Sequence, residues 1–233
     1  MVSQVLFGET IHIVESRADW IRIQADFDGY EGWCQSTHYM LLGESGNRKA
    51  RHVLNANWVG KLESKTFEIK IPFGSSLMLD SKDNIIWSKP GLKFRGTYLD
   101  PLKMSGTKSN IRMCAFQFLE TPYLWGGKTI FGTDCSGFTQ TVYKFFNIAL
   151  RRDAWQQAEQ GDFVKGLTES KMGDLAFFEN EAGRITHVGI LLDGQKIIHA
   201  SGKVRVDFVD EGGIKNSETG ERTHQLALVK RYL

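Results

Sequence analysis

One cysteine and two histidines have the residue types and the spacing that covalent hydrolysis needs. Cys135 lies in the Thr-Asp-Cys-Ser-Gly-Phe segment 133–138, where small and polar residues open an apolar helical run. A helix N-terminus directs unpaired N–H groups and the positive end of its dipole at its first turn, which favours a thiolate over a thiol. His187 and His199 follow in two apolar segments. A thiol nucleophile, a base and a residue that orients the base make up a cysteine hydrolase.

The two histidines flank a predicted hairpin whose turn contains Asp193 and Gly194. A two-residue turn would put the histidines on opposite faces. A three-residue loop with Gly194 in the left-handed conformation pairs residue 191 with residue 195 and places His187 directly opposite His199, with Cβ atoms about 4.5–5.5 Å apart. In that register the other face is an apolar strip made by Val188, Ile190, Leu192, Ile198 and Ala200. We therefore predict this register.

The roles follow from the predicted geometry. Cys135 is the candidate nucleophile, and His187 is the candidate base that takes the thiol proton. His199 would hold the imidazole of His187 through its other ring nitrogen and so fix its tautomer.

Simpler interpretations compete with this one. A cysteine before an apolar helix is more often a small buried hydrophobe, and a histidine in a strand is usually structural. One cysteine and two histidines also match a zinc site with an open position, although no carboxylate or second cysteine lies at short ligand spacing to any of them. The co-occurrence of a cysteine at a helix start with two histidines on one face favours the thiol. We expect no metal ion and no organic cofactor.

The elements that must position these residues change character along the chain. The first hundred residues predict short strands at 10–14, 20–24, 67–71, 76–79 and 85–87, with frequent turns typical of small barrels. Trp20, Trp33 and Trp58 are expected in the cores of these barrels. The polar segment 101–110 is the predicted domain boundary.

Helices are predicted next, at 111–120, 135–146 and 152–161. Strands follow at 173–178, 185–192, 196–201, 204–208 and 226–233. Helices followed by a run of antiparallel strands predict an α+β domain.

Composition sets wide limits. The 233 residues fit one large domain or a medium domain with an appendage, 41% are hydrophobic, and the net charge is +2. So small a charge, with no Lys/Arg block, argues against nucleic acid, and no 18-residue apolar run predicts a membrane span. Three cysteines without a paired spacing, and no signal-peptide pattern, favour the cytoplasm. We expect a monomer.

The second half of the chain resembles the NlpC/P60-type cell-wall cysteine peptidases, which are papain-like. The matching segments, in the family's order, are 121–127, 134–138, 173–178, 186–190 and 198–200. The resemblance implies that Cys135, His187 and His199 form the catalytic triad. It also implies that Tyr123, in a Pro-Tyr-x-Trp-Gly-Gly segment, binds the oxyanion or orients the thiolate.

The first half resembles bacterial SH3 modules, through Gly8-Glu9, Trp20 and the Gly-Tyr-Glu-Gly-Trp segment 29–33. The predicted fold is therefore an α+β papain-like domain at 105–233, preceded by all-β SH3-like barrels at 1–43 and 44–104. Similar proteins carry a further leading strand before the segment that matches 1–9. If a leader has been removed, the cell envelope or periplasm is the alternative location.

SH3 modules fused to such a peptidase look most like the γ-D-glutamyl-diamino-acid peptidases that recycle peptidoglycan peptides. The resemblance implies a substrate of the form L-Ala-γ-D-Glu-(Lys or diaminopimelate) with a free N-terminus. Glu9, Tyr30 and Asp153 would hold its ammonium, since a desolvated ammonium needs charge-assisted acceptors. Asp134 and Ser136 would contact the substrate backbone or the D-Glu α-carboxylate.

Each assignment has an alternative. Glu9 could be a solvated charge at a strand end, and Tyr30 could serve only in packing. Asp153 and Asp134 each precede a predicted helix, so each is also a candidate N-cap.

Three other functions stay open at this point. An endopeptidase or amidase acting on intact cell wall would use the SH3 modules as anchors and would not need a free amine. A wall-binding module on an inert domain is a second alternative. Acyl transfer to lipid is a third, although no amphipathic membrane helix is evident.

Overall fold

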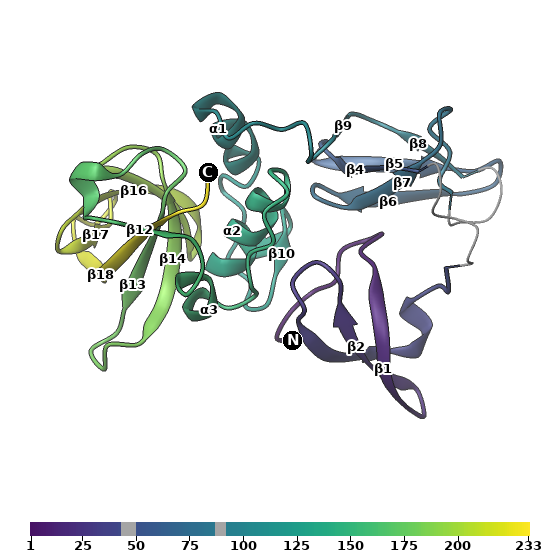
Figure 1. The fold of residues 1–233 in the computed structure, drawn as a ribbon, viewed down its shortest axis with the longest axis horizontal. Helices are drawn as coiled ribbons and strands as arrows, with labels where there is room; N and C mark the ends of the chain where they lie inside the picture. The colour runs from purple at the N-terminus through teal and green to yellow at the C-terminus, as the bar shows by residue number, and fades with distance from the viewer. Residues whose placement is uncertain (43–49, 87–91) are drawn as a thin grey trace. The chain divides into compact units, whose positions relative to one another are not determined.

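The computed structural model describes residues 1–42, 50–86 and 92–233, which divide into two compact units (Figure 1). Unit 1 contains Met1–Gln4 and Met104–Leu233, and unit 2 contains Val5–Lys103. The predicted boundary at residues 43–44 and the predicted strand residue Trp87 lie outside the described residues. The division of the first half into two separate modules therefore stays a prediction.

Unit 2 is built from short antiparallel strands. One sheet has the order β1-β2-β3, a second β7-β4-β9 and a third β6-β5-β8. The strands are β1 (Ile11–Arg17), β2 (Trp20–Ala25), β3 (Glu31–Gln35), β4 (Arg51–Asn55), β5 (Val59–Glu63), β6 (Glu68–Pro72), β7 (Ser76–Leu79), β8 (Lys93–Arg95) and β9 (Tyr98–Leu99). A 3-10 turn, η1 (Ser36–His38), follows β3. The strand predicted at 85–87 is not present at residues 85 and 86: Ile85 makes only an isolated bridge to Leu79.

The apolar alternation of the strands builds the interior of unit 2. Leu62, Ile71 and Leu77 belong to one buried cluster. The prediction that the three tryptophans lie in the cores is wrong: Trp20, Trp33 and Trp58 are 48%, 43% and 54% exposed. Aliphatic residues, together with Phe73 and Phe94, occupy the buried positions instead.

Three helices carry the first part of unit 1. They are α1 (Lys108–Phe116), α2 (Cys135–Lys144) and α3 (Ala154–Ala158). The Thr107 hydroxyl accepts a hydrogen bond from Asn110 N and caps α1, so this helix begins and ends earlier than predicted. A two-stranded hairpin, β10 (Lys128–Thr129) and β11 (Gly132–Thr133), leads into α2. In the described part of the chain, no helix is long and apolar enough to span a membrane.

A seven-stranded antiparallel sheet forms the rest of unit 1, in the order β12-β18-β13-β14-β15-β16-β17. Its strands are β12 (Asp162–Val164), β13 (Leu175–Glu179), β14 (Ile185–Leu191), β15 (Lys196–Ser201), β16 (Lys203–Asp210), β17 (Gly213–Lys215) and β18 (Arg222–Arg231). A 3-10 turn, η2 (Leu167–Glu169), lies between β12 and β13. Pairing of β17 with β18 closes the sheet into a barrel.

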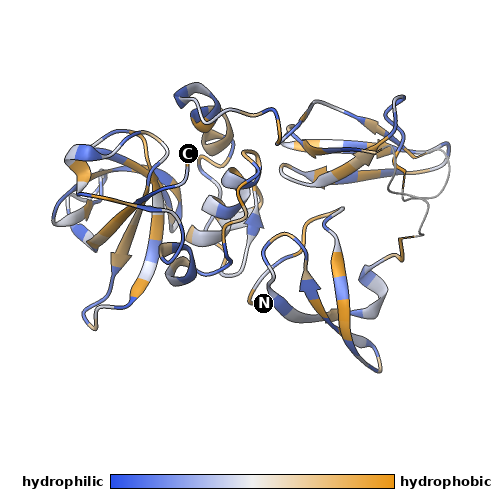
Figure 2. Ribbon diagram, viewed as in Figure 1, coloured by the Kyte–Doolittle hydropathy of each residue, from blue (hydrophilic) through white to orange (hydrophobic). Residues whose placement is uncertain are grey.

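Both faces of this sheet are covered by apolar side chains. A buried cluster that includes Phe178, Leu191, Ile197 and Val209 fills what we call the inner face. Helix α2, buried along its whole length, lies against β14 and β15 on the other face (Figure 1). Figure 2 shows the apolar residues gathered along the strands of unit 1.

The β14–β15 hairpin differs from its predicted register by two residues. Leu191 pairs with Ile197 and Gly189 pairs with His199, so the prediction that His187 lies directly opposite His199 is wrong. Asp193 Oδ1 accepts a hydrogen bond from Gln195 N at 2.8 Å and shapes a loop in which Gly194 is not left-handed.

The histidines nevertheless share a face, because the pleat of a strand repeats every two residues and a shift of two conserves it. The predicted apolar strip on the other face is buried: Val188, Ile190, Ile198 and Ala200 are each 0% exposed.

Candidate active site

Cys135 is the first residue of α2. The N-cap is Asp134, whose Oδ1 accepts a hydrogen bond from Gly137 N at 2.7 Å. A Cβ atom at position 137 would overlap the carbonyl oxygen of Gly127, so the helix start packs against this loop only with glycine there. Backbone N–H groups of Val188 and Ser136 face the Cys135 sulfur. The thiol therefore lies against the strand residue that follows His187.

Burial, more than the helix start, determines the ionisation of this thiol. It raises the pKa of Cys135 to about 12, and the negative charge of Asp134 adds to the rise. The N–H groups of Val188 and Ser136 and the charge of Arg152 oppose it. The expected preference of the helix N-terminus for a thiolate is thus present but outweighed. In the free protein Cys135 is a neutral thiol that needs a base.

His187 and His199 are in direct contact. His187 Nε2 lies 2.8 Å from His199 Nδ1, and the side chains are diagonal neighbours on β14 and β15. The residue opposite His199 is Gly189, where a Cβ atom would come within 2.8 Å of His199 Cβ and 2.7 Å of Ile197 Cδ1. Glycine therefore provides the space through which His199 reaches His187.

His187 is buried, and burial lowers its pKa well below the usual value, with further lowering by His199 and His224. Its imidazole is therefore neutral at physiological pH. The Cys135 sulfur meets the N–H of Val188, the residue that follows His187 on β14, so the thiol and the imidazole belong to neighbouring positions of one site. A neutral thiol and a neutral imidazole are the starting state for general-base activation.

Two residues without a predicted role complete this cluster. His224 on β18 stacks on His187, with ring centroids 4.1 Å apart and planes at 25°. Burial lowers the pKa of His224 to about 4, and His199 contributes to the lowering. Asp207 on β16 places Oδ2 3.0 Å from His199 Nε2. The sequence analysis missed both because their positions depend on strand pairing: Asp207 reaches His199 through the pairing of β16 with β15, and His224 reaches His187 through the closing of the barrel between β17 and β18.

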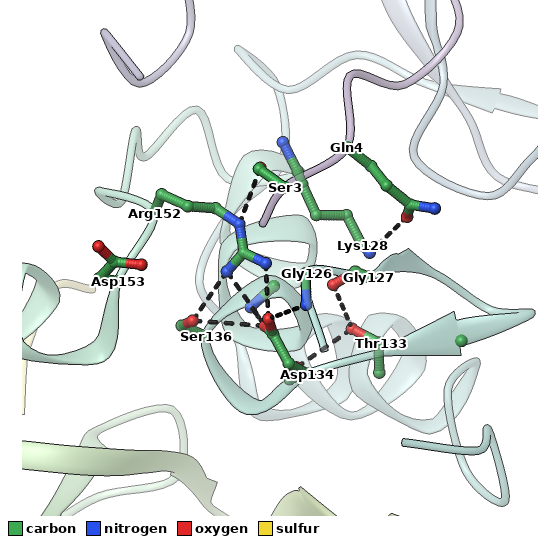
Figure 3. Close-up of polar contacts among 12 residues, drawn as sticks. Ser3, Gln4, Gly126, Gly127, Lys128, Thr133, Asp134, Ser136, Arg152 and Asp153 are labelled. Atoms are coloured by element: carbon green, nitrogen blue, oxygen red, sulfur yellow. Dashed lines mark hydrogen bonds and ion pairs between the residues drawn. The ribbon is translucent and has the colours of Figure 1, made fainter. Parts of the chain in front are cut away.

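Asp134 and Ser136, the neighbours of the nucleophile, are tied to Arg152 (Figure 3). Arg152 Nη2 donates to Asp134 Oδ2 at 2.6 Å, and Nη1 donates to Asp134 Oδ1 at 3.1 Å and to Ser136 Oγ at 2.9 Å. Gly126 N also donates to Asp134 Oδ2, at 2.8 Å. The side chains of Arg152 and Asp134 are 1% and 8% exposed, so the pair is a buried bidentate salt bridge.

The first residues of the chain contact the same network. Arg152 Nε donates to Ser3 Oγ at 2.9 Å, and Lys128 N donates to Gln4 Oε1 at 2.8 Å (Figure 3). Met1–Gln4 belongs to the same compact unit as α2. These bonds fix the segment against the loop that precedes the nucleophile.

Tyr123 lies beside the strand that leads to the nucleophile, since it forms a parallel bridge with Thr133. Burial is the main cause that raises the pKa of Tyr123 to about 12, with smaller contributions from Cys135 and Asp134. The phenol is therefore protonated at neutral pH and can donate a hydrogen bond near the thiol.

The three residues predicted to hold an ammonium belong to two units. Glu9 Oε2 accepts from Leu6 N at 2.7 Å, and Tyr30 N donates to Asp28 Oδ1 at 3.0 Å, both within unit 2. Asp153 in unit 1 is the N-cap of α3, and its N–H donates to Gln156 Oε1 at 3.2 Å. Both aspartates considered as caps are caps, and a joint role of the three residues stays a prediction.

A metal centre was the other interpretation of the cysteine and the histidines. Over 1–42, 50–86 and 92–233, no three His, Cys, Asp or Glu side chains gather so that they could hold a metal ion.

Comparison with known proteins matches both halves of the chain. Residues 120–223 match the NlpC/P60 family, and residues 1–38 match the bacterial dipeptidyl-peptidase SH3 domain. A γ-D-glutamyl-L-lysine dipeptidyl-peptidase of Bacillus subtilis is 32% identical over 85% of this chain and 71% of its own length. Dipeptidyl-peptidase 6 of Lysinibacillus sphaericus is 28% identical over 91% of this chain and 85% of its own length.

A solved structure has the same fold. The NlpC/P60 family protein from Bacillus cereus superposes with a TM-score of 0.78 at 23% identity, over 99% of this chain and 82% of that one. The barrel, the helix that bears the cysteine and the paired histidines are thus part of a papain-like peptidase, and the chain belongs to the NlpC/P60 family of cysteine peptidases.

Proposed function

We propose that this peptidase hydrolyses the bond between γ-D-Glu and the diamino acid in peptidoglycan-derived peptides with a free N-terminal L-Ala. The observation that supports it most is the 32% identity to a γ-D-glutamyl-L-lysine dipeptidyl-peptidase over 85% of the chain, together with the match of residues 1–38 to the bacterial dipeptidyl-peptidase SH3 domain. Both γ-D-Glu–Lys and γ-D-Glu–diaminopimelate bonds fit the proposal.

The reaction begins with a proton transfer. His187 takes the proton of Cys135, and the thiolate attacks the γ-carbonyl carbon. The oxyanion that forms accepts a hydrogen bond from the protonated Tyr123 hydroxyl. His187 then gives its proton to the leaving amine as the C–N bond breaks, and L-Ala-D-Glu stays on the sulfur as a thioester. A water molecule, deprotonated by His187, attacks the thioester and releases L-Ala-D-Glu.

The γ linkage and the free amine define the substrate. The scissile carbonyl belongs to a side chain, so a site built for an α-amide would misplace it. Glu9, Tyr30 and Asp153 are proposed to accept hydrogen bonds from the ammonium of L-Ala, which would reject internal bonds of the intact wall. Asp134 and Ser136 are proposed to contact the substrate backbone or the D-Glu α-carboxylate. We propose that the enzyme acts in the cytoplasm on peptides already released from the wall.

The test is digestion of L-Ala-γ-D-Glu-L-Lys and its N-acetylated twin, followed by mass spectrometry. Release of L-Ala-D-Glu from the free peptide alone supports the proposal. Equal cleavage of both peptides would contradict the requirement for a free amine and would favour an endopeptidase that acts on intact wall. Cleavage of neither peptide by the folded protein would remove this substrate class.

A further inference from the structure

Asp207 reaches the two histidines through strand pairing. In the β15–β16 pair, Asp207 lies opposite Ile197 and Arg205 lies opposite His199. Asp207 is thus a diagonal neighbour of His199 on the face that also carries His187. The three side chains belong to three consecutive strands, β14, β15 and β16, with each contact made to a diagonal neighbour.

The carboxylate of Asp207 is held from several sides. Ser217 donates to Oδ1 from its N–H at 2.9 Å and from its hydroxyl at 2.7 Å. His199 Nε2 lies 3.0 Å from Oδ2, and Arg205 Nε lies 3.0 Å from the same oxygen as an ion pair with poor hydrogen-bond alignment. Asp207 is 3% exposed. The group is thus oriented and cannot exchange its partners with solvent freely.

Burial alone would favour the protonated acid, but the hydrogen bonds from His199 and Ser217 outweigh it and lower the pKa of Asp207. The group is ionised at neutral pH, and an ionised carboxylate only accepts hydrogen bonds. His199 Nε2 must therefore carry a proton.

The tautomers of both rings follow from that proton. A neutral His199 with a protonated Nε2 has a bare Nδ1, which can only accept. The partner at 2.8 Å, His187 Nε2, must then donate. A neutral His187 with a protonated Nε2 leaves its Nδ1 as a lone-pair base. We propose that Asp207 is a positioning residue that fixes the tautomers of His199 and His187, so that His187 presents an unprotonated Nδ1 to the Cys135 thiol.

The proton balance of the first step fits this arrangement. One proton moves from Cys135 Sγ to His187 Nδ1, and the S–H bond breaks as the N–H bond forms. The His187 imidazolium keeps its proton on Nε2 and still donates it to His199 Nδ1. No other proton has to move. The buried negative charge of Asp207 offsets the new positive charge through His199, in the way that an orienting carboxylate acts in a Ser-His-Asp triad. The inference rests on the proposed roles of Cys135 and His187.

The substitution Asp207→Asn should invert the tautomers of His199 and His187, because Ser217 orients the new amide. The N–H and the hydroxyl of Ser217 both donate to Oδ1, whereas Arg205 Nε lies 3.0 Å from Oδ2 without making a hydrogen bond. We therefore expect the amide oxygen to take the place of Oδ1 and the amide NH₂ to take the place of Oδ2. His199 Nε2 must then accept, its Nδ1 must donate, and His187 must accept at Nε2. In that state the proton of a neutral His187 lies on Nδ1, where the base is needed.

The matched control is Asp210→Asn. Asp210 is on the same strand and is exposed, in an ion pair with Arg222. We expect turnover of L-Ala-γ-D-Glu-L-Lys by Asp207→Asn to fall by about 10³–10⁴-fold in kcat, the scale of an inverted tautomer in a triad, with little change in KM. The control should stay within about twofold of wild type.

Two readouts need no substrate. Nitrogen-15 NMR of histidine-labelled protein should show His187 protonated at Nε2 in wild type and in the control, and at Nδ1 in Asp207→Asn. Alkylation of Cys135 by iodoacetamide at pH 7 should slow in Asp207→Asn, with circular dichroism confirming that the variant is folded.

Unchanged tautomers in folded Asp207→Asn would overturn the inference. So would inverted tautomers with alkylation at the wild-type rate. A wild type that shows the expected tautomers but cleaves no γ-D-Glu peptide would reject the proposed substrate and leave the role of Asp207 intact.

Discussion

The buried salt bridge beneath the nucleophile gives the sharpest prediction about stability. Replacing Arg152 with methionine keeps much of its volume and removes its guanidinium. Asp134 would lose the donors at 2.6 and 3.1 Å and keep those of Gly126 and Gly137. Its carboxylate would stay buried without a countercharge.

The magnitude follows from that burial. Breaking a buried pair by removing one partner costs about 3–5 kcal/mol, because the remaining charge is left uncompensated. Ser136 Oγ and Ser3 Oγ would each lose a donor at 2.9 Å as well. For a unit of this size, the loss corresponds to a fall in Tm of about 10–20 °C.

The control is the adjacent residue. Arg151 pairs with Glu159 at 2.9 Å, but the two side chains are 51% and 56% exposed. An exposed pair contributes about 0–1 kcal/mol, so Arg151→Met should change Tm by no more than a few degrees. Urea denaturation followed by circular dichroism gives the free energy of unfolding for wild type and both variants.

A third variant separates the charge from the contacts. In Asp134→Asn combined with Arg152→Met, both charges are gone and the asparagine can still cap α2. We expect the double variant to be more stable than Arg152→Met alone, since the uncompensated charge is removed. The reasoning is refuted if Arg152→Met destabilises the protein no more than Arg151→Met does. It is also refuted if adding Asp134→Asn to Arg152→Met lowers the free energy of unfolding by as much as Asp134→Asn does alone.

Two other predictions concern the histidine cluster. Gly189→Ala places a Cβ atom within 2.8 Å of His199 Cβ. We therefore expect the free energy of unfolding to fall by about 1–3 kcal/mol and kcat to decrease. Urea titration and turnover measured on the same sample test both. An alanine variant as stable and active as wild type would show that glycine is not needed there. The pKa values of His187 and His224 are lowered in the folded state, to about 4 for His224. The same histidines titrate at about 6.5 in the unfolded chain, so unfolding takes up protons below that pH. The free energy of unfolding therefore decreases as the pH falls from about 6.5 toward 4. His224→Phe keeps the stacked ring and removes one of these groups, so its stability measured at pH 7, 5.5 and 4 should fall less steeply, and an equal slope would contradict the assigned burial.

The residues predicted from sequence were those whose placement depends on local pattern. Cys135 begins its helix because Asp134 caps it and an apolar run follows, and both signals lie within a few residues of each other. The alternation of apolar residues placed His187 and His199 on one face. The hairpin register was missed because the Asp193 side chain, and not a left-handed Gly194, shapes the turn.

Long-range pairing decided what the sequence did not reveal. Asp207 stands in the alternating strand β16, and its place beside His199 comes only from the pairing with β15. His224 reaches His187 because the barrel closes between β17 and β18. An arginine such as Arg152 usually indicates a solvated surface, and its partner lies 18 positions earlier in the chain.

The central claim is covalent catalysis by Cys135, and trapping the thioester tests it most directly. The protein is mixed with L-Ala-γ-D-Glu-L-Lys, quenched in acid within milliseconds, digested and analysed by mass spectrometry. Cys34 and Cys114 are also free and serve as internal controls. The account predicts an L-Ala-D-Glu adduct on the peptide that contains Cys135, with no adduct on the other two cysteines and no cleavage by Cys135→Ala. Cleavage that persists in Cys135→Ala would contradict it.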